Sequence, residues 1–115
     1  MKGTNLGEFE ELVLLLVVAL PDEAYSVAIA DKIKEKTGRS YAHSVIHTAL
    51  YRLEEKGFAQ SKMGAATSER GGRRKRMYTI TAAGMKALET SKAHRDQFWS
   101  MIPKTRIADI YGRSN

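Results

Sequence analysis

The apolar residues near the start of the chain recur every three or four positions, which is the spacing of a helix. They are Phe9, Leu12, Val13, Leu16, Val17 and Leu20. Asn5 and Glu8 resemble a capping box ahead of this pattern, and Pro21 ends it. The other side of the helix is also apolar, with Leu14, Leu15, Val18 and Ala19. A helix that is apolar all round is buried all round. A chain of 115 residues can hardly cover both faces, so we expect a second chain there.

Two more helices are predicted, over residues 25–37 and 41–56, and each ends at a glycine, Gly38 or Gly57. The first turns Val27, Ile29, Ala30 and Ile33 inward. The second has a one-sided apolar stripe made of Val45, Ile46, Ala49, Leu50 and Leu53. Because only a short turn separates them, the two helices are typical of a helix-turn-helix.

A change to alternating residues then predicts a β-hairpin, with strands over 58–63 and 75–81 and a loop between them. Thr81 is a suitable N-cap for a last helix that runs to residue 102. Its predicted seam is Met85, Leu88, Lys92, Arg95, Trp99 and Ile102. The predicted fold is mainly α with a small β-hairpin wing. It comprises a winged helix-turn-helix domain over 1–81, a C-terminal dimerisation helix over 82–102 and a loosely ordered tail over 103–115.

The positive charge of the chain is concentrated in the hairpin. The net charge is +6, yet residues 1–57 carry 7 Lys and Arg against 9 Asp and Glu, whereas residues 58–81 carry 6 against 1. Five of the seven residues from 70 to 76 are cationic, and they would repel one another without a polyanion. The candidate wing contacts to DNA are Arg70, Arg73, Arg74, Lys75 and Arg76.

The face of the third helix opposite its apolar stripe carries side chains that can hydrogen-bond a base edge or a phosphate, and none is acidic. They are His43, Ser44, His47, Thr48, Tyr51 and Arg52. Residues one turn apart share one surface. With Ser40 and Tyr41 just before them, they are the candidate contacts to a DNA groove, although Arg52 could instead pair with a neighbouring acid.

Other chemistries find little support. The sequence contains no Cys, and His43 with His47 supplies only two ligands, so we expect no metal site. Nothing resembles a catalytic motif or a nucleotide loop, so we expect neither an enzyme nor a cofactor. The longest apolar run, from Leu12 to Leu20, is far shorter than the roughly 20 residues of a membrane-spanning helix. Acidic residues 8, 10 and 11 argue against a signal peptide. We expect a cytoplasmic protein without membrane contact.

Four stretches, residues 7–15, 23–29, 47–57 and 70–84, resemble PadR-type transcriptional regulators in a short form. The most specific parts are Leu50-x-x-Leu53-x-x-x-Gly57 and the basic wing that runs into Tyr78-x-Ile80-Thr81-x-x-Gly84. The resemblance implies a winged-helix domain, dimerisation through the first and last helices, and repression by operator binding that an effector often relieves. Two positions depart from the family's usual residues, namely Ser26 in place of Gly and His47 in place of Tyr.

The expected function is that of a homodimeric repressor that binds a pseudo-palindromic operator in double-stranded DNA. The alternatives are a winged-helix protein–protein adaptor and an RNA-binding module. Phe98 and Trp99 are candidates for the dimer interface or for an effector pocket. Trp99 is expected either to anchor the dimer or to form the wall of a pocket for a planar aromatic effector.

Overall fold

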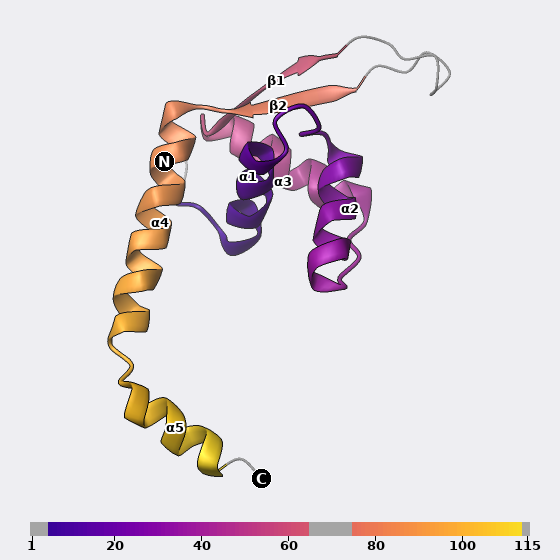
Figure 1. Cartoon of the computed structure of the whole chain (residues 1–115). Helices are drawn as coiled ribbons and strands as arrows, with labels where there is room; N and C mark the ends of the chain where they lie inside the picture. Colours follow the sequence, from indigo (N-terminus) through magenta and orange to yellow (C-terminus); the bar gives the residue numbers. More distant parts are fainter. Residues whose placement is uncertain (1–4, 65–74, 114–115) are drawn as a thin grey trace.

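A computed structural model describes residues 5–64 and 75–113. Within these ranges the elements follow in the order α1 (Glu8–Ala19), α2 (Ser26–Thr37), α3 (His43–Glu55), β1 (Ala59–Met63), β2 (Arg76–Ile80), α4 (Ala82–Ser100) and α5 (Lys104–Arg113). Figure 1 shows the first three helices gathered beneath the hairpin, with α4 leaving the end of β2 and α5 at its far end. The mainly helical fold with a β-hairpin wing is therefore confirmed.

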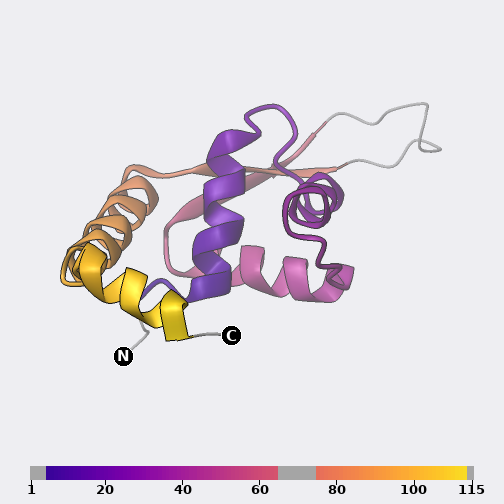
Figure 2. The ribbon, with the colours of Figure 1, turned by 60° about the horizontal axis from the view of Figure 1, so that its bottom comes forward.

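One hydrophobic core lies among α1, α2, α3 and the base of the hairpin. Figures 1 and 2 both place α1 between α4 on one side and α2 on the other. The most deeply buried large side chains come from the three helices that the apolar spacing predicted: Val13, Leu14, Ile29, Ile33, Ile46, Leu50 and Leu53. Phe58, Tyr78 and Leu88 close the core from the hairpin and from α4.

The N-cap of helix α1 lies two residues later in the chain than expected. Its N-cap is Gly7, not Asn5, and Glu10 rather than Glu8 reaches back to accept the Gly7 N–H at 2.9 Å. The Asn5 backbone carbonyl instead accepts a 2.6 Å hydrogen bond from Lys56 Nζ. Because this distant lysine holds the segment before α1, the helix starts where Glu10 can satisfy a free backbone N–H.

The second apolar side of α1 is only partly left uncovered. Leu14 is fully buried beside Val13 and Val17, so it belongs to the core of this chain. Leu15 remains 48% exposed and Val18 39% exposed. The surface that this helix leaves for a partner is therefore narrower than its sequence predicts.

The helix-turn-helix closes as its glycines predict. Gly38 and Gly57 have φ values of 75° and 81°, the left-handed conformation in which side chains other than glycine are strained. In α3, Ile46, Ala49, Leu50 and Leu53 are buried as expected. Val45 is the exception, because it is exposed. Residue 45 lies about 100° round the helix from Ile46, which turns it away from the core.

The hairpin is antiparallel, with Ala59 opposite Ile80 and Met63 opposite Arg76. The Tyr78 N–H donates to the Ala24 carbonyl at 2.9 Å, which fixes β2 to the segment between α1 and α2. The wing therefore emerges from the core at a defined angle beside α3.

Helix α4 buries side chains only near its start. Thr81 caps it by accepting the Gly84 N–H at 3.0 Å, as predicted. Gly84 and Leu88 are its buried residues. Of the predicted seam, Met85, Trp99 and Ile102 are exposed large hydrophobic residues, and Lys92 pairs with Asp96 on its own helix.

The segment predicted to be a loosely ordered tail contains helix α5, which begins directly after Pro103. It buries no side chain, and Ile110 and Tyr111 are exposed. The tail was predicted because this segment offers few apolar residues to bury, and the structure agrees that it buries none. A helix needs only its own backbone hydrogen bonds to form, so the small number of buried residues did not exclude one.

Candidate nucleic-acid interface

The polar face of α3 is open to solvent. The six predicted residues on the helix, His43, Ser44, His47, Thr48, Tyr51 and Arg52, are all exposed. Tyr51 is 62% exposed, although it is an aromatic residue. The acids of this helix, Glu54 and Glu55, lie at its C-terminal end. The first three turns therefore offer a phosphate or a base edge only neutral donors and acceptors and one cation.

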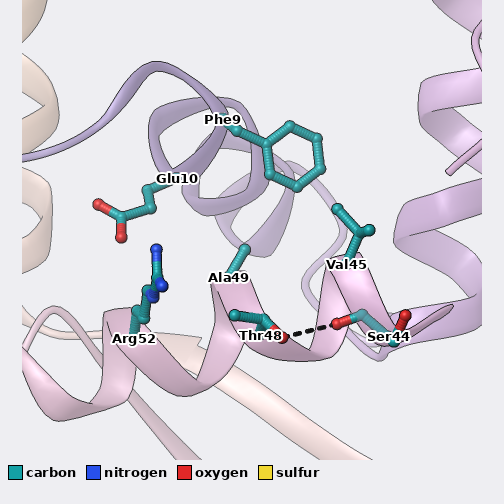
Figure 3. Close-up of a pocket in the computed structure, with 7 residues that line it drawn as sticks. All are labelled: Phe9, Glu10, Ser44, Val45, Thr48, Ala49 and Arg52. Atoms are coloured by element: carbon teal, nitrogen blue, oxygen red, sulfur yellow. Dashed lines mark hydrogen bonds between the residues drawn. The ribbon is translucent and has the colours of Figure 1, made fainter. Parts of the chain in front are cut away.

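These six residues form two rows. Ser44, Thr48 and Arg52 lie along the edge of α3 that faces α1 and line a hollow of about 310 Å³ (Figure 3). Its other lining residues are Phe9, Glu10, Val45 and Ala49. Residues 43, 47 and 51 are each one position earlier, about 100° round the helix, so their row is turned away from α1. The Thr48 hydroxyl donates to the Ser44 backbone carbonyl at 2.8 Å, so its proton is already in use within the helix.

Glu10 draws Arg52 toward α1. Figure 3 shows the Arg52 side chain directed at the Glu10 carboxylate. Burial raises the pKa of Glu10, but hydrogen bonds from Lys56 and the Gly7 N–H, together with the charges of Lys56 and Arg52, outweigh it and hold the pKa below its ordinary value. The carboxylate is therefore charged at neutral pH. It attracts Arg52, which is the alternative that the sequence left open.

The two predicted contacts that precede the N-cap of α3, Ser40 and Tyr41, differ in their surroundings. Ser40 is exposed, whereas Tyr41 is half-buried. The Tyr41 ring lies 4.8 Å from the Phe9 ring, tilted by 47°, and packs against the core. Tyr41 therefore helps to fix the start of α3 against α1, which is a packing role that the sequence did not predict.

The two wing cations that the structure describes both contact the protein. The Lys75 ammonium lies 4.2 Å from the centroid of the Tyr25 ring, in a cation–π contact. Arg76 Nη1 donates to the Ser61 hydroxyl at 3.0 Å, and that hydroxyl donates to the Glu54 carboxylate at 2.8 Å. Lys75 thus joins the hairpin to the start of α2. Arg70, Arg73 and Arg74 lie outside the described residues.

We did not predict Tyr25, Ser61 or Lys56 as parts of this surface from the sequence. Each acts through a contact with a residue far along the chain, for example Lys56 with Glu10 at 2.6 Å. No local motif marks such pairs.

The other candidate sites are placed as follows. Phe98 and Trp99 lie near the end of α4 and are 68% and 67% exposed. Among the described residues, no group of three His, Asp or Glu side chains could hold a metal ion. No helix in the described ranges is both long and apolar enough to cross a membrane.

A helix-turn-helix followed directly by a two-stranded hairpin defines a winged-helix domain of the kind found in DNA-binding regulators. The model of the PadR-like family of transcriptional regulators matches residues 14–90, and the chain belongs to this family.

Solved structures of family members have the same fold. A PadR-like transcriptional regulator from Bacillus cereus is 19% identical, with a TM-score of 0.62 over 93% of each chain. A PadR family regulator from Eggerthella lenta is 19% identical, with a TM-score of 0.64 over 94% of this chain and 88% of the other. Bacillus subtilis PadR in complex with operator DNA is 21% identical, with a TM-score of 0.61 over 90% of this chain and 64% of the other. Comparison with curated proteins gave no match.

Proposed function

We propose that this protein is a homodimeric, sequence-specific DNA-binding repressor that acts in the cytoplasm. The observation that carries the proposal is the exposed face of α3, which bears no acid over residues 43–53 and stands next to a basic hairpin. DNA presents acceptors in its major groove and phosphates on either side, and this composition complements both. The structure of Bacillus subtilis PadR with operator DNA supports the same use of this fold. The activity requires no catalytic group and no cofactor.

The α3 helix would enter the major groove, with the wing on the flanking phosphates. His43, His47 and Tyr51 point away from α1 and are the best placed to reach base edges, and Ser44 adds a hydroxyl at the start of the helix. Arg70, Arg73 and Arg74 would bind phosphates or a narrow minor groove. Lys75 and Arg76, which already contact Tyr25 and Ser61, would hold the base of the wing in place.

The proposed dimer is supported by apolar side chains that this chain leaves exposed on α1, α4 and the segment after α4. They are Leu15, Val18, Met85, Phe98, Trp99, Met101 and Ile102. An exposed set of this size, on two helices that contact each other and on the segment after them, is typical of an interaction surface. A two-fold dimer would read a pseudo-palindromic operator with half-sites about one helical turn apart, or a multiple of it.

Selection of bound duplexes from a random library tests the function. The proposal predicts enrichment of one pseudo-palindromic sequence, whose binding survives competition by structured RNA. Preferential binding to the RNA would favour the RNA-binding alternative. Failure to enrich any duplex, together with capture of an acidic protein partner, would favour the adaptor.

We further propose that Trp99 lies at the dimer interface and that an effector, if it is a planar aromatic molecule, stacks on the indole ring. Trp99→Ala separates the two roles. Loss of the dimer in sedimentation, with weaker DNA binding, identifies an anchor. An intact dimer that no longer binds planar aromatic compounds in calorimetry identifies a pocket wall. If neither property changes, Trp99 lies outside both sites.

A further inference from the structure

An ion pair between two side chains joins the first turn of α1 to the outer half of α4. Glu11 Oε1 accepts hydrogen bonds from Arg95 Nη2 at 2.8 Å and from Arg95 Nε at 3.2 Å. The Glu11 side chain is only 12% exposed, and the Arg95 side chain is 51% exposed. Two charge-assisted bonds to one shielded carboxylate fix the direction of the guanidinium plane. This pair is therefore more directional than an ordinary surface ion pair.

The rest of α4 has little to hold it. Its buried residues are Gly84 and Leu88, in its first two turns, and every residue from 92 to 100 is exposed. Gly84 acts as the attachment point, and Arg95 lies eleven residues further along, about 16 Å at 1.5 Å per residue. Figure 1 shows that the far end of α4 leads away from the body. The Glu11–Arg95 pair is therefore placed where it can fix the angle of α4 against α1.

We propose that the Glu11–Arg95 pair sets the distance between the two α3 helices of the dimer, and thereby the operator spacing that the protein accepts. The inference rests on the proposed function, in which α4 joins two subunits that each read one half-site. In such a dimer α4 belongs to the dimer interface, and α3 is the helix that contacts the DNA bases. A contact that fixes the angle between α4 and the body therefore also fixes the position of each α3 on the DNA.

The geometry makes small changes significant. A displacement of about 2 Å at Arg95, over the arm of about 16 Å, turns α4 by about 7°. Residue 84 lies against the Phe58 carbonyl, and residue 47 of α3 is eleven positions before Phe58, so residue 47 lies about 16 Å from this attachment point. The same 7° moves each α3 by about 2 Å and the pair by about 4 Å, which is about one base-pair step. Loss of this one contact would therefore widen the range of half-site spacings that the dimer can bind by about a base pair.

The test measures spacing preference, which a purely structural role would not change. The two halves of the sequence selected from a random duplex library are rejoined with spacers from three base pairs shorter to three longer. Wild-type protein, Glu11→Gln, Arg95→Gln and the charge-swapped Glu11→Arg/Arg95→Glu double variant are each titrated against this panel. The matched control is Lys92→Gln, because the Lys92–Asp96 pair lies within α4, one turn from Arg95, and does not reach the body.

The wild type should favour one spacing by about tenfold or more over spacers two base pairs away, because a half-site displaced by about 7 Å loses its base contacts. Glu11→Gln and Arg95→Gln should reduce this preference to about threefold or less while remaining dimeric in sedimentation. The double variant should recover much of it, and Lys92→Gln should behave as wild type.

Two outcomes overturn the inference. In one, the single variants keep the wild-type spacing preference, so the pair does not position α4. In the other, they become monomeric, so the pair holds the interface together and does not set an angle. If the wild type itself shows no preferred spacing, the failure lies in the proposed dimeric function.

Discussion

Replacement of Gly84 by Ala should destabilise the protein, although the same change in a helix is normally favourable. A Cβ at residue 84 would lie well inside van der Waals contact distance of the Phe58 carbonyl oxygen and 2.9 Å from Ile80 Cγ1. That carbonyl accepts the Thr81 N–H at 3.0 Å, and the Thr81 hydroxyl caps α4. The atom in the way belongs to the backbone, so α4 or the segment before β1 must move and the cap with it.

The magnitude follows from two opposing effects. Ala is better than Gly inside a helix by about 1 kcal/mol. Overpacking of a closed site costs about 1–3 kcal/mol, and loss of an N-cap about 1 kcal/mol more. The net loss should be about 2 kcal/mol. For 115 residues, with an unfolding entropy of about 2.1 cal/mol/K per residue, this lowers Tm by about 8 °C.

Urea and thermal unfolding followed by circular dichroism, at one fixed protein concentration, measure this loss. Gly112→Ala is the matched control, because Gly112 lies in α5 and a Cβ there meets nothing within 4 Å. Its stability should be unchanged or slightly higher. If Gly84→Ala were as stable as Gly112→Ala, the close approach of α4 to residue 58 would not exist in solution.

Three further predictions concern the DNA surface and its support. The double variant Arg73→Ala/Arg74→Ala should bind all duplexes more weakly and to a similar extent. The slope of log affinity against log salt should flatten by about 0.9 per lost phosphate contact. An unchanged slope would show that these residues do not contact the DNA backbone. His47→Ala should change which operator is preferred, at about 1–3 kcal/mol per base contact. The control His94→Ala, on α4, should not change the preference. Equal losses of affinity for operator and random DNA would show that His47 contacts phosphates. Because the pKa of Glu10 is lowered from 4.5, its stabilisation is present above about pH 4.5 and lost as the pH falls through the folded value. Lys56→Met should flatten that acid limb in urea titrations, and an unaltered limb would show that Lys56 does not lower this pKa.

The sequence predicted the order and type of the elements from α1 to α4, though not α5, because each of them carried its own local signal. The stripe through Ile46, Leu50 and Leu53 has helical spacing, and the core uses the same residues. Gly38 and Gly57 mark helix ends, since left-handed residues are required there. The Thr81-x-x-Gly84 pattern also has a physical reason, namely a cap and a close approach.

Pairing between distant residues could not be predicted in this way. Lys56 contacts both Asn5 and Glu10, across 51 and 46 positions. Arg95 meets Glu11 across 84 positions. Such contacts depend on how the helices cross, and a period within one helix holds no information about crossing. The displaced start of α1 has the same origin, because Lys56 holds the Asn5 carbonyl.

The division of the α3 face into two rows follows from that crossing and bears directly on specificity. The predicted face has six residues, and all of them can form hydrogen bonds. The sequence distinguishes only Arg52, as the weakest candidate, and ranks the other five equally. In the structure, α1 lies against one edge of the face, where Glu10 attracts Arg52 and the Thr48 hydroxyl bonds within its own helix. The residues of the other row, His43, His47 and Tyr51, are further from α1. Since a groove accepts one helix and excludes the element beside it, this outer row would enter the DNA more deeply. Base discrimination should therefore depend more on His47 than on Thr48, although the two are neighbours in sequence.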